Sequence, residues 1–275
     1  MVFAHTVFAL PFALIAFTMA YLEAPPERPI LLLFQVLACM VTARNSAMSF
    51  NRYADRLIDA QNERTQNREL PSGKLSPRAV LTFFGVNVLL FLLCCLSINR
   101  LCLYLAFPAL IVLCGYSYTK RFTWLCHFVL GLALAIAPAG AYIAVTGTLT
   151  FPVLWLSIMV VLWVSGFDIL YSLPDEQHDR AHTLHSIPQY FGRKKALYLS
   201  GGLHLLVLPL LALVGLNISA GWVYWVAASI FTGLLIYQHT IVSVRDISKL
   251  NRAFFTTNGV ASTLFALLTI AGLLL

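Results

Sequence analysis

The sequence predicts an all-α protein that crosses a membrane many times. Of its 275 residues, 60% are hydrophobic and 11% are charged, against about 45–50% and about 25% in soluble domains. The mean hydropathy is +0.82, and a soluble protein of this composition would expose larger apolar patches than monomers tolerate. A soluble domain and a disordered chain are therefore disfavoured. The net charge of +7 does not indicate a nucleic-acid partner, because basic cytoplasmic loops account for it.

Long apolar segments give the number of membrane crossings. A helix needs about 20 apolar residues to cross the ~30 Å hydrocarbon core. Such segments lie at residues 2–22, 30–50, 79–97, 101–118, 124–145, 152–173, 196–215, 219–240 and 254–275. We therefore expect about nine transmembrane helices, and we expect residues 1–275 to form a single integral-membrane domain.

The basic residues predict the orientation, because Lys and Arg concentrate on the cytoplasmic side of membrane proteins. All but three of the 18 basic residues fall in every second connection, at residues 51–78, 118–123, 174–195 and 241–253. The exceptions are Arg28, Arg44 and Arg100. This alternation places the N-terminus and the basic connections in the cytoplasm, with the C-terminus outside. We expect a multi-pass protein of the cell (inner) membrane.

The six cysteines do not indicate a zinc site or a disulfide framework. They lie in or beside apolar segments, and no two of them form a CxxC pair. Buried, unreactive thiols are the better interpretation.

Acidic residues are rare in this chain and cluster in two stretches at the cytoplasmic ends of predicted spans. In each stretch polar side chains recur at intervals of four residues, which on a helix places them on one face. Asp168 lies deeper in its span, where it can equally be a hydrogen-bonded structural partner. The two sets are Asn51, Asp55 and Asp59, and, 120 residues later, Tyr171, Asp175 and Asp179.

Carboxylates gathered near a membrane repel one another unless a cation joins them. Carboxylate and amide oxygens are the ligands that Mg²⁺ prefers, and Mg²⁺ commonly completes its shell with water and substrate phosphates. Arginines are interleaved with the first acidic stretch, and their guanidinium groups pair well with phosphate oxygens. This combination indicates a metal-bridged diphosphate site that faces the cytoplasm.

These stretches resemble the signatures of the UbiA superfamily of intramembrane prenyltransferases. The first signature is matched by Arg44-Asn45-Ser46-Ala47, Asn51-x3-Asp55-x3-Asp59, Arg64-Thr65-x2-Arg68 and Pro71-Ser72-Gly73. The second is matched by Asp168-x2-Tyr171-x3-Asp175-x3-Asp179, and the basic loop between them by residues 116–123. The resemblance runs in order from His5 to about Gly192 and implies a UbiA-type helical bundle around a central cavity open to the cytoplasm.

Two positions depart from the pattern of many members. Arg52 follows the first Asn where many members have Asp, and Glu69 follows the second Arg of the RTxxR stretch where many have Pro. With the opening residues 5–11, these positions look more like the 4-hydroxybenzoate polyprenyltransferase-like branch. Part of that branch belongs to the futalosine route to menaquinone, whose acceptor is a dihydroxynaphthoate.

The resemblance implies a Mg²⁺-dependent transfer of a polyprenyl group from polyprenyl diphosphate to an aromatic acid. The acceptor would be 4-hydroxybenzoate or a dihydroxynaphthoate, in ubiquinone or menaquinone biosynthesis. Two Mg²⁺ ions would bridge the diphosphate to the catalytic and metal-binding residues Asn51, Asp55, Asp59, Asp175 and Asp179. Residues expected to bind the substrates are Arg44, Arg64, Arg68, Lys74, Lys120, Arg121, Asp168 and Tyr171. The expected partners are the two substrates and the lipid bilayer, with no nucleic acid and no inferable protein partner.

Three alternatives compete with this interpretation. The same fold could use another acceptor or cyclise a terpene, and the motifs do not separate these activities. An ion-coupled transporter would carry its acids near the middle of the spans, whereas most of these acids lie at the inner ends. A CDP-alcohol phosphotransferase would need a DGxxAR stretch, which this sequence lacks.

Overall fold

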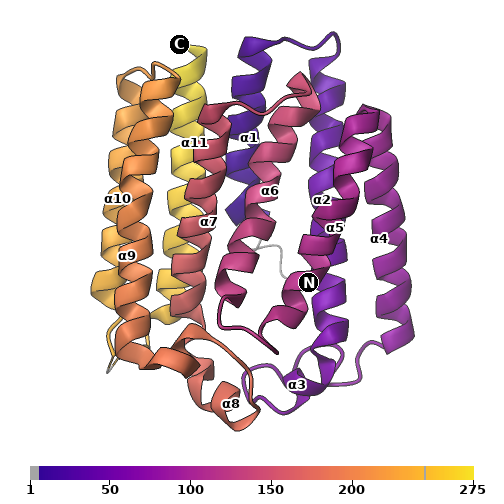
Figure 1. Cartoon of the computed structure of the whole chain (residues 1–275), viewed down its shortest axis with the longest axis vertical. Coiled ribbons are helices and arrows are strands. Elements are labelled where there is room, and N and C mark those ends of the chain that lie inside the picture. The colour runs from indigo at the N-terminus through magenta and orange to yellow at the C-terminus, as the bar shows by residue number, and fades with distance from the viewer. Residues whose placement is uncertain (1–5, 245) are drawn as a thin grey trace.

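The computed structural model describes residues 6–244 and 246–275, and within them it is a bundle of long helices (Figure 1). The long helices are α1 (Thr6–Glu23), α2 (Pro29–Ala54), α4 (Pro77–Ile98), α5 (Arg100–Thr119), α6 (Cys126–Thr146), α7 (Phe151–Tyr171), α9 (Ile187–Asn217), α10 (Trp222–Ile241) and α11 (Asn258–Leu274). His5, Arg245 and the start of the first predicted span lie outside the described residues.

Each of the nine predicted spans overlaps one of these helices, which confirms the all-helical prediction. Seven helices in the described part of the chain are long and apolar enough to cross a membrane, and residues 8–23 form a shorter apolar helix. Helix α10 does not reach the hydropathy of the other spans, because it is rich in Trp, Tyr, Gln and His. The chain is an integral multi-pass protein, but the predicted count of nine crossings is not confirmed.

Capping side chains explain where several helices begin. The side chain of Ser76 accepts a hydrogen bond from the amide of Ala79, at 3.2 Å, and starts α4. Asn99 adopts an extended backbone between α4 and α5, and its side chain accepts from the amide of Cys102 at 2.8 Å. Such caps satisfy amides that have no partner within the helix. Asn99 therefore divides the long apolar stretch 79–118 into two helices, as predicted.

Helix α7 lies at the centre of the packing. Its Trp163 is fully buried and packs against Phe12 of α1 and Phe231 of α10, with ring centroids 5.1 and 5.7 Å apart. By contrast, α4 and α5 expose many large apolar side chains, including Leu89 and Ile111. In a bilayer these side chains face lipid, so their exposure does not destabilise the protein.

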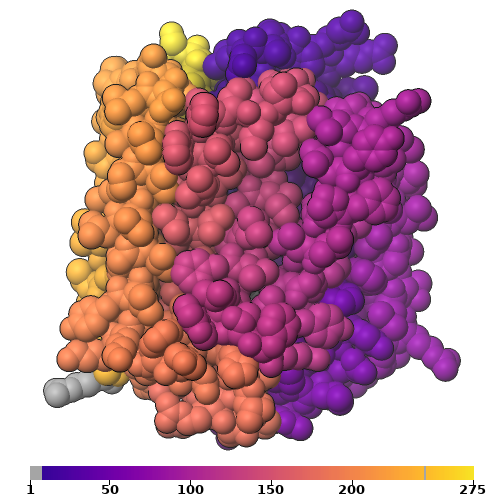
Figure 2. All heavy atoms as spheres, in the orientation of Figure 1, coloured from indigo at the N-terminus to yellow at the C-terminus, as the bar shows by residue number. Residues whose placement is uncertain are grey.

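Two short helices lie together at one end of the bundle, opposite the C-terminus (Figure 1). Helix α3 (Arg56–Ala60) follows α2, and a 3-10 turn (Leu173–Asp175) connects α7 to α8 (Glu176–Ala181). Figure 2 shows α8 and the segment that enters α9 covering the lower end of one face. Gly192 bends the start of α9, and its φ of 78° is accessible to glycine without steric cost. This end of the molecule carries both acidic stretches.

Candidate active site

The first acidic stretch keeps its helical register across the end of α2. The amide of Asp55 donates to the carbonyl of Asn51 at 2.9 Å, and the amide of Asp59 donates to the carbonyl of Asp55 at 2.7 Å. The side chain of Asn51 also donates to Asp55 Oδ2 at 3.0 Å. The three side chains are therefore stacked one turn apart, as their spacing predicts.

Basic side chains neutralise both carboxylates of the first stretch. Asp55 and Asp59 are 3% and 4% exposed. Lys120 Nζ lies 3.0 Å from Asp55 Oδ2, and Arg121 Nη2 lies 3.3 Å from Asp55 Oδ1. Arg68 Nη1 lies 2.8 Å from both oxygens of Asp59. Burial of a carboxylate is costly unless a cation compensates it, and here the predicted substrate-binding residues supply that cation.

The second acidic stretch is not one continuous helix, and this part of the prediction is wrong. Helix α7 ends at Tyr171, the 3-10 turn carries Asp175, and α8 carries Asp179. Pro174 lies in this turn, and proline cannot donate the backbone hydrogen bond that would continue α7. The chain therefore turns between Tyr171 and Asp175, although their spacing equals that of the first stretch.

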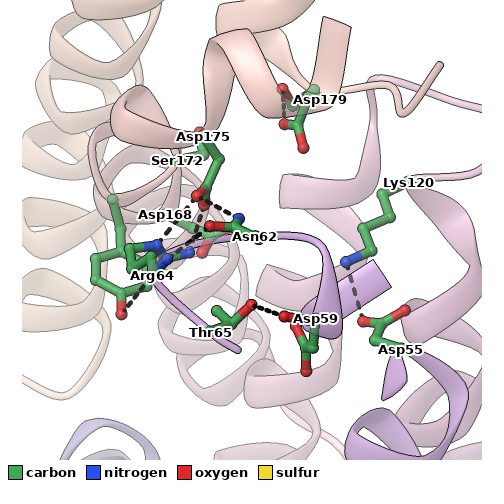
Figure 3. Close-up of polar contacts among 12 residues, drawn as sticks. Asp55, Asp59, Asn62, Arg64, Thr65, Lys120, Asp168, Ser172, Asp175 and Asp179 are labelled. Atoms are coloured by element: carbon green, nitrogen blue, oxygen red, sulfur yellow. Dashed lines mark hydrogen bonds and ion pairs between the residues drawn. The ribbon is translucent and has the colours of Figure 1, made fainter. Parts of the chain in front are cut away.

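Arg64 joins the two stretches (Figure 3). Its Nε donates to Asp175 Oδ1 at 3.0 Å, and its Nη2 forms a second short bond with Asp175 Oδ2. Its Nη1 donates to the Tyr171 hydroxyl at 2.9 Å, and the guanidinium lies 4.9 Å from the centre of that ring. Asn62 donates to the same carboxylate at 3.1 Å. The loop after the first stretch thus reaches across to the second.

Asp179 and Asp168 differ from the other acids because neither forms an ion pair with a described Lys or Arg. Asp179 Oδ2 accepts a hydrogen bond from Ser186 at 2.7 Å, and burial raises the pKa of the Asp179 carboxyl above its usual range. Asp168 Oδ2 lies 2.7 Å from His127 Nδ1. The predicted residue Lys74 is exposed and forms no ion pair with the described residues, so the structure does not bring it into the group.

An apolar cavity of about 440 Å³ extends from this end of the bundle between the helices. At the acidic end its wall includes Arg44, Asn51 and Arg52 of α2, and Asp168 and Tyr171 of α7. Towards the other end it is lined by apolar and small residues, among them Val36, Ile98, Cys102, Ala137 and Ala144. Along α2, Asn51 and Val36 are separated by about 22 Å at the rise of an α-helix. A long apolar chain fits this shape.

The donor set suits Mg²⁺ held together with a phosphate-containing substrate. Figure 3 shows the carboxylates of Asp55 and Asp59 on one side of the site and those of Asp175 and Asp179 on the other. Within residues 6–244 and 246–275, no three His, Cys, Asp or Glu side chains are grouped closely enough to hold a metal by themselves. Magnesium is commonly held by one or two carboxylates plus water and substrate phosphates. The residues fit such a metal–diphosphate unit better than a metal held by protein groups alone.

Sequence reasoning missed Asn62, Ser186 and His127. Asn62 also accepts the amide of Arg64 through its side chain at 2.9 Å, which shapes the loop that carries Arg64. Ser186 both binds Asp179 and caps α9. An Asn two residues before the RTxxR stretch and a Ser before Pro188 were visible turn and cap signals. The position of His127 opposite Asp168 depends on how α6 packs on α7. No sequence pattern near His127 predicts this contact.

Comparison with known proteins identifies relatives across almost the whole chain. The model of the UbiA prenyltransferase family matches residues 9–274. The 4-hydroxybenzoate octaprenyltransferase of Nitrosospira multiformis is 33% identical over 248 residues, covering 89% of this chain and 83% of that relative. The protein of the same name from Aliivibrio fischeri is 31% identical over 240 residues, covering 87% and 83%.

Solved structures show the same fold. The apo structure of a UbiA homologue from Aeropyrum pernix K1 has a TM-score of 0.85 at 26% identity, covering 100% of this chain and 98% of that chain. A UbiA homologue from Archaeoglobus fulgidus, bound to DMAPP and Mg²⁺, has a TM-score of 0.74 at 20% identity, covering 98% and 96%. The likeness to the second structure concerns the fold alone.

Proposed function

Because the chain belongs to the UbiA prenyltransferase family, we propose that it transfers a polyprenyl group from polyprenyl diphosphate to the ring of an aromatic acid in quinone biosynthesis. The acceptor is 4-hydroxybenzoate or a dihydroxynaphthoate, and residues 1–275 act as one domain. The relatives named 4-hydroxybenzoate octaprenyltransferase support an aromatic acid as acceptor. The homologue bound to DMAPP and Mg²⁺ supports a prenyl diphosphate as donor.

The observation that carries this proposal is the pairing of two acidic stretches at the end of an apolar cavity. Asn51, Asp55 and Asp59 would hold one Mg²⁺ ion, and Asp175 and Asp179 a second. The metal supplies Lewis acidity that stabilises the departing diphosphate. Asn51 lines the cavity, and Figure 3 shows Asp55 and Asp59 on one side of the site and Asp175 and Asp179 on the other. This arrangement supports a diphosphate bound between the two groups.

The basic residues neutralise the negative charge of the diphosphate that Mg²⁺ does not compensate. Arg64, Arg68, Lys120 and Arg121 hold the carboxylates in this structure. When the carboxylates bind metal, these cations become available to the diphosphate oxygens without a long movement. Guanidinium groups bind phosphate oxygens in pairs, so they hold the leaving group in one orientation. Lys74 is also among the residues predicted to bind the substrates, but we assign it no contact with the diphosphate.

The cavity wall favours the reaction at the prenyl carbon. Loss of diphosphate leaves an allylic cation, which water would trap, and an apolar cavity excludes water. The ring of Tyr171 stacks on Phe254 with centroids 4.0 Å apart, and both residues line the cavity. Aromatic faces stabilise cations. Arg44 lies in the same wall, where it can bind the carboxylate of the acceptor.

The orientation follows from the distribution of charge. Asp55 and Asp59 lie within the basic connection 51–78, and Asp175 and Asp179 lie within 174–195. Basic connections stay in the cytoplasm. We therefore place the active site at the cytoplasmic face of the cell (inner) membrane.

The test is an assay for the prenylated product. Membranes containing the protein are incubated with Mg²⁺, a short prenyl diphosphate and either 4-hydroxybenzoate or 1,4-dihydroxy-6-naphthoate, and the adduct is sought by mass spectrometry. We expect an adduct with one acceptor that disappears when EDTA removes the metal. Release of diphosphate with a cyclised prenyl product, or uptake of the diphosphate into vesicles without any product, would overturn the proposal.

A further inference from the structure

Asp168 is the one acidic residue among the described residues that line the cavity. Asp55, Asp59, Asp175 and Asp179 are assigned to the metal and the diphosphate, and none of them is among the described residues that line the cavity. The side chain of Asp168 is 21% exposed, and it lines the same cavity as Arg44, which is assigned to the carboxylate of the acceptor. A carboxylate in this position can act on the ring rather than on the metal.

We propose that Asp168 is the base that removes the proton from the acceptor ring, and that His127 is a positioning residue that holds Asp168 for this step. This inference rests on the function proposed above and adds two residue roles to it. It follows from the geometry of the pair and from two features that Asp168 combines: it lines the cavity, which Asp179 does not, and it forms no ion pair with a described Lys or Arg, unlike Asp55, Asp59 and Asp175.

The tautomer of His127 is set by its two neighbours. The amide of Ile187 donates to His127 Nε2 at 3.3 Å, so that nitrogen is the acceptor. The proton of a neutral ring then lies on Nδ1, which donates to Asp168 Oδ2 at 2.7 Å. The side chain of His127 is 3% exposed. A buried imidazole with both nitrogens bonded holds the carboxylate at a fixed angle to the cavity.

The second oxygen of the Asp168 carboxylate remains available to take up a proton. Its Oδ1 receives no hydrogen bond from any residue in the described part of the chain. Asp55, Asp59 and Asp175 are each bound by at least one guanidinium or ammonium group. Both oxygens of each of these three carboxylates are occupied by such contacts. Asp168 has a histidine in place of that cation and keeps one free oxygen for a proton.

The close approach of α6 and α7 maintains this pair. Gly131, one turn after His127, packs against α7 so tightly that a Cβ atom there would lie 2.5 Å from the carbonyl oxygen of Val161. Ser165 of α7 donates to the carbonyl of His127 at 3.2 Å. The backbone of α6 is therefore anchored to α7 one turn before Asp168.

The ring substitution consists of loss of diphosphate, attack by the ring and loss of a proton. The C–O bond of the prenyl diphosphate breaks, and its electron pair leaves with the diphosphate. The ring carbon beside the acceptor hydroxyl gives a π-electron pair to the prenyl carbon, which leaves a cationic ring carrying both the prenyl group and a hydrogen at that carbon. Asp168 Oδ1 takes this hydrogen as a proton, and the C–H electron pair restores the aromatic ring. The proton passes to water when the product leaves.

The substitution D168N tests the role of the base. Asparagine has the same shape and its oxygen can still accept the bond from His127, but its amide is not a base. With an acceptor deuterated at the reacting carbon, we expect no isotope effect on kcat in the wild type, because loss of diphosphate limits the rate. In D168N, kcat should fall by about 10²–10⁴-fold, KM for the prenyl diphosphate should be unchanged, and a normal deuterium isotope effect should appear.

Two further variants separate positioning from folding. His127→Gln should lower kcat by about 10–100-fold and should also reveal the isotope effect, which a merely structural histidine would not. Asp168→Glu retains the carboxylate and should recover part of the activity lost in D168N. Asp246→Asn, in the exposed loop before α11, is the matched control.

The outcomes distinguish a failure of the proposed function from a failure of the role assigned to Asp168. A wild-type protein that forms no prenylated adduct contradicts the proposed function, and the inference falls with it. A wild-type protein that forms the adduct, with D168N either fully active or impaired without an isotope effect, contradicts the role of Asp168 alone. Loss of binding of the prenyl diphosphate in D168N would instead make Asp168 part of the metal site, and would also overturn the inference.

Discussion

Individual carboxylates at the site form ion pairs with arginine side chains that we expect to bind the substrates. Asp59 receives both of its short contacts from Arg68, and Asp175 is held by the fork of Arg64. These pairs compensate the charge of the carboxylates, which would otherwise be costly to bury. They also keep the guanidinium groups beside the position assigned to the diphosphate. Their existence could not be deduced from the sequence, because Arg64 and Asp175 are 111 residues apart.

Arg44 lines the cavity, and its role can be tested by the choice of acceptor. Arg44→Ala should raise KM for a carboxylated acceptor by about 10-fold or more, because a hydrogen bond to a charged group is lost. KM for the prenyl diphosphate should change little. Arg100→Ala, exposed at the start of α5 on the opposite side of the bundle, is the control. An equal loss with an acceptor that lacks the carboxyl group would remove this role from Arg44.

At the scale of the helices, most of the fold could be predicted. Long apolar runs predict the helices, and the alternation of basic connections is compatible with one simple arrangement of the spans. The predicted segments 101–118 and 152–173 differ from α5 and α7 by one or two residues at each end. The short helices α3 and α8 and the bend at Gly192 were not predicted. Their stability depends on contacts with other elements at the site rather than on periodicity, and short helices are marginal by themselves.

The packing of α6 on α7 can be tested at Gly131. Gly131→Ala would place a methyl group 2.5 Å from Val161 O and 2.7 Å from Ser165 Oγ, so the helices must separate. We expect a loss of about 1–3 kcal/mol of stability and a lower Tm for the detergent-solubilised protein. Gly140→Ala on the same helix meets nothing within 4 Å and should unfold like the wild type. Equal Tm values for both variants and the wild type would show that the two helices are not tightly packed there.

At the scale of the whole molecule, the cavity extends between the helices from the end that carries the proposed diphosphate site. The motifs predicted that such a cavity exists, but its shape depends on the side chains of several helices and could not be read from the sequence. Its apolar part is lined by small residues of α5 and α6, including Ala106, Ala137 and Ala141. Small side chains leave room for a long substrate tail, so the length of the cavity should limit the prenyl chain.

Ala137→Phe tests this relation, since Ala137 lines the cavity and is only partly buried. The larger ring should obstruct the apolar part of the cavity and leave the acidic end intact. We expect kcat/KM for a long polyprenyl diphosphate to fall by about 10-fold or more, because overpacking costs about 1–3 kcal/mol, while a short prenyl diphosphate is still used. If both donors lose activity equally, the tail does not follow this path.

The central claim is that both acidic stretches hold one diphosphate through Mg²⁺. The most direct measurement is the affinity of the purified protein for an unreactive prenyl diphosphate analogue, with and without Mg²⁺, in the wild type, Asp55→Asn and Asp175→Asn. The account predicts metal-dependent binding in the wild type and a loss of about 10-fold or more in each variant, as expected when a charged contact is removed. Wild-type affinity in either variant, or tight binding that persists in EDTA, would contradict it.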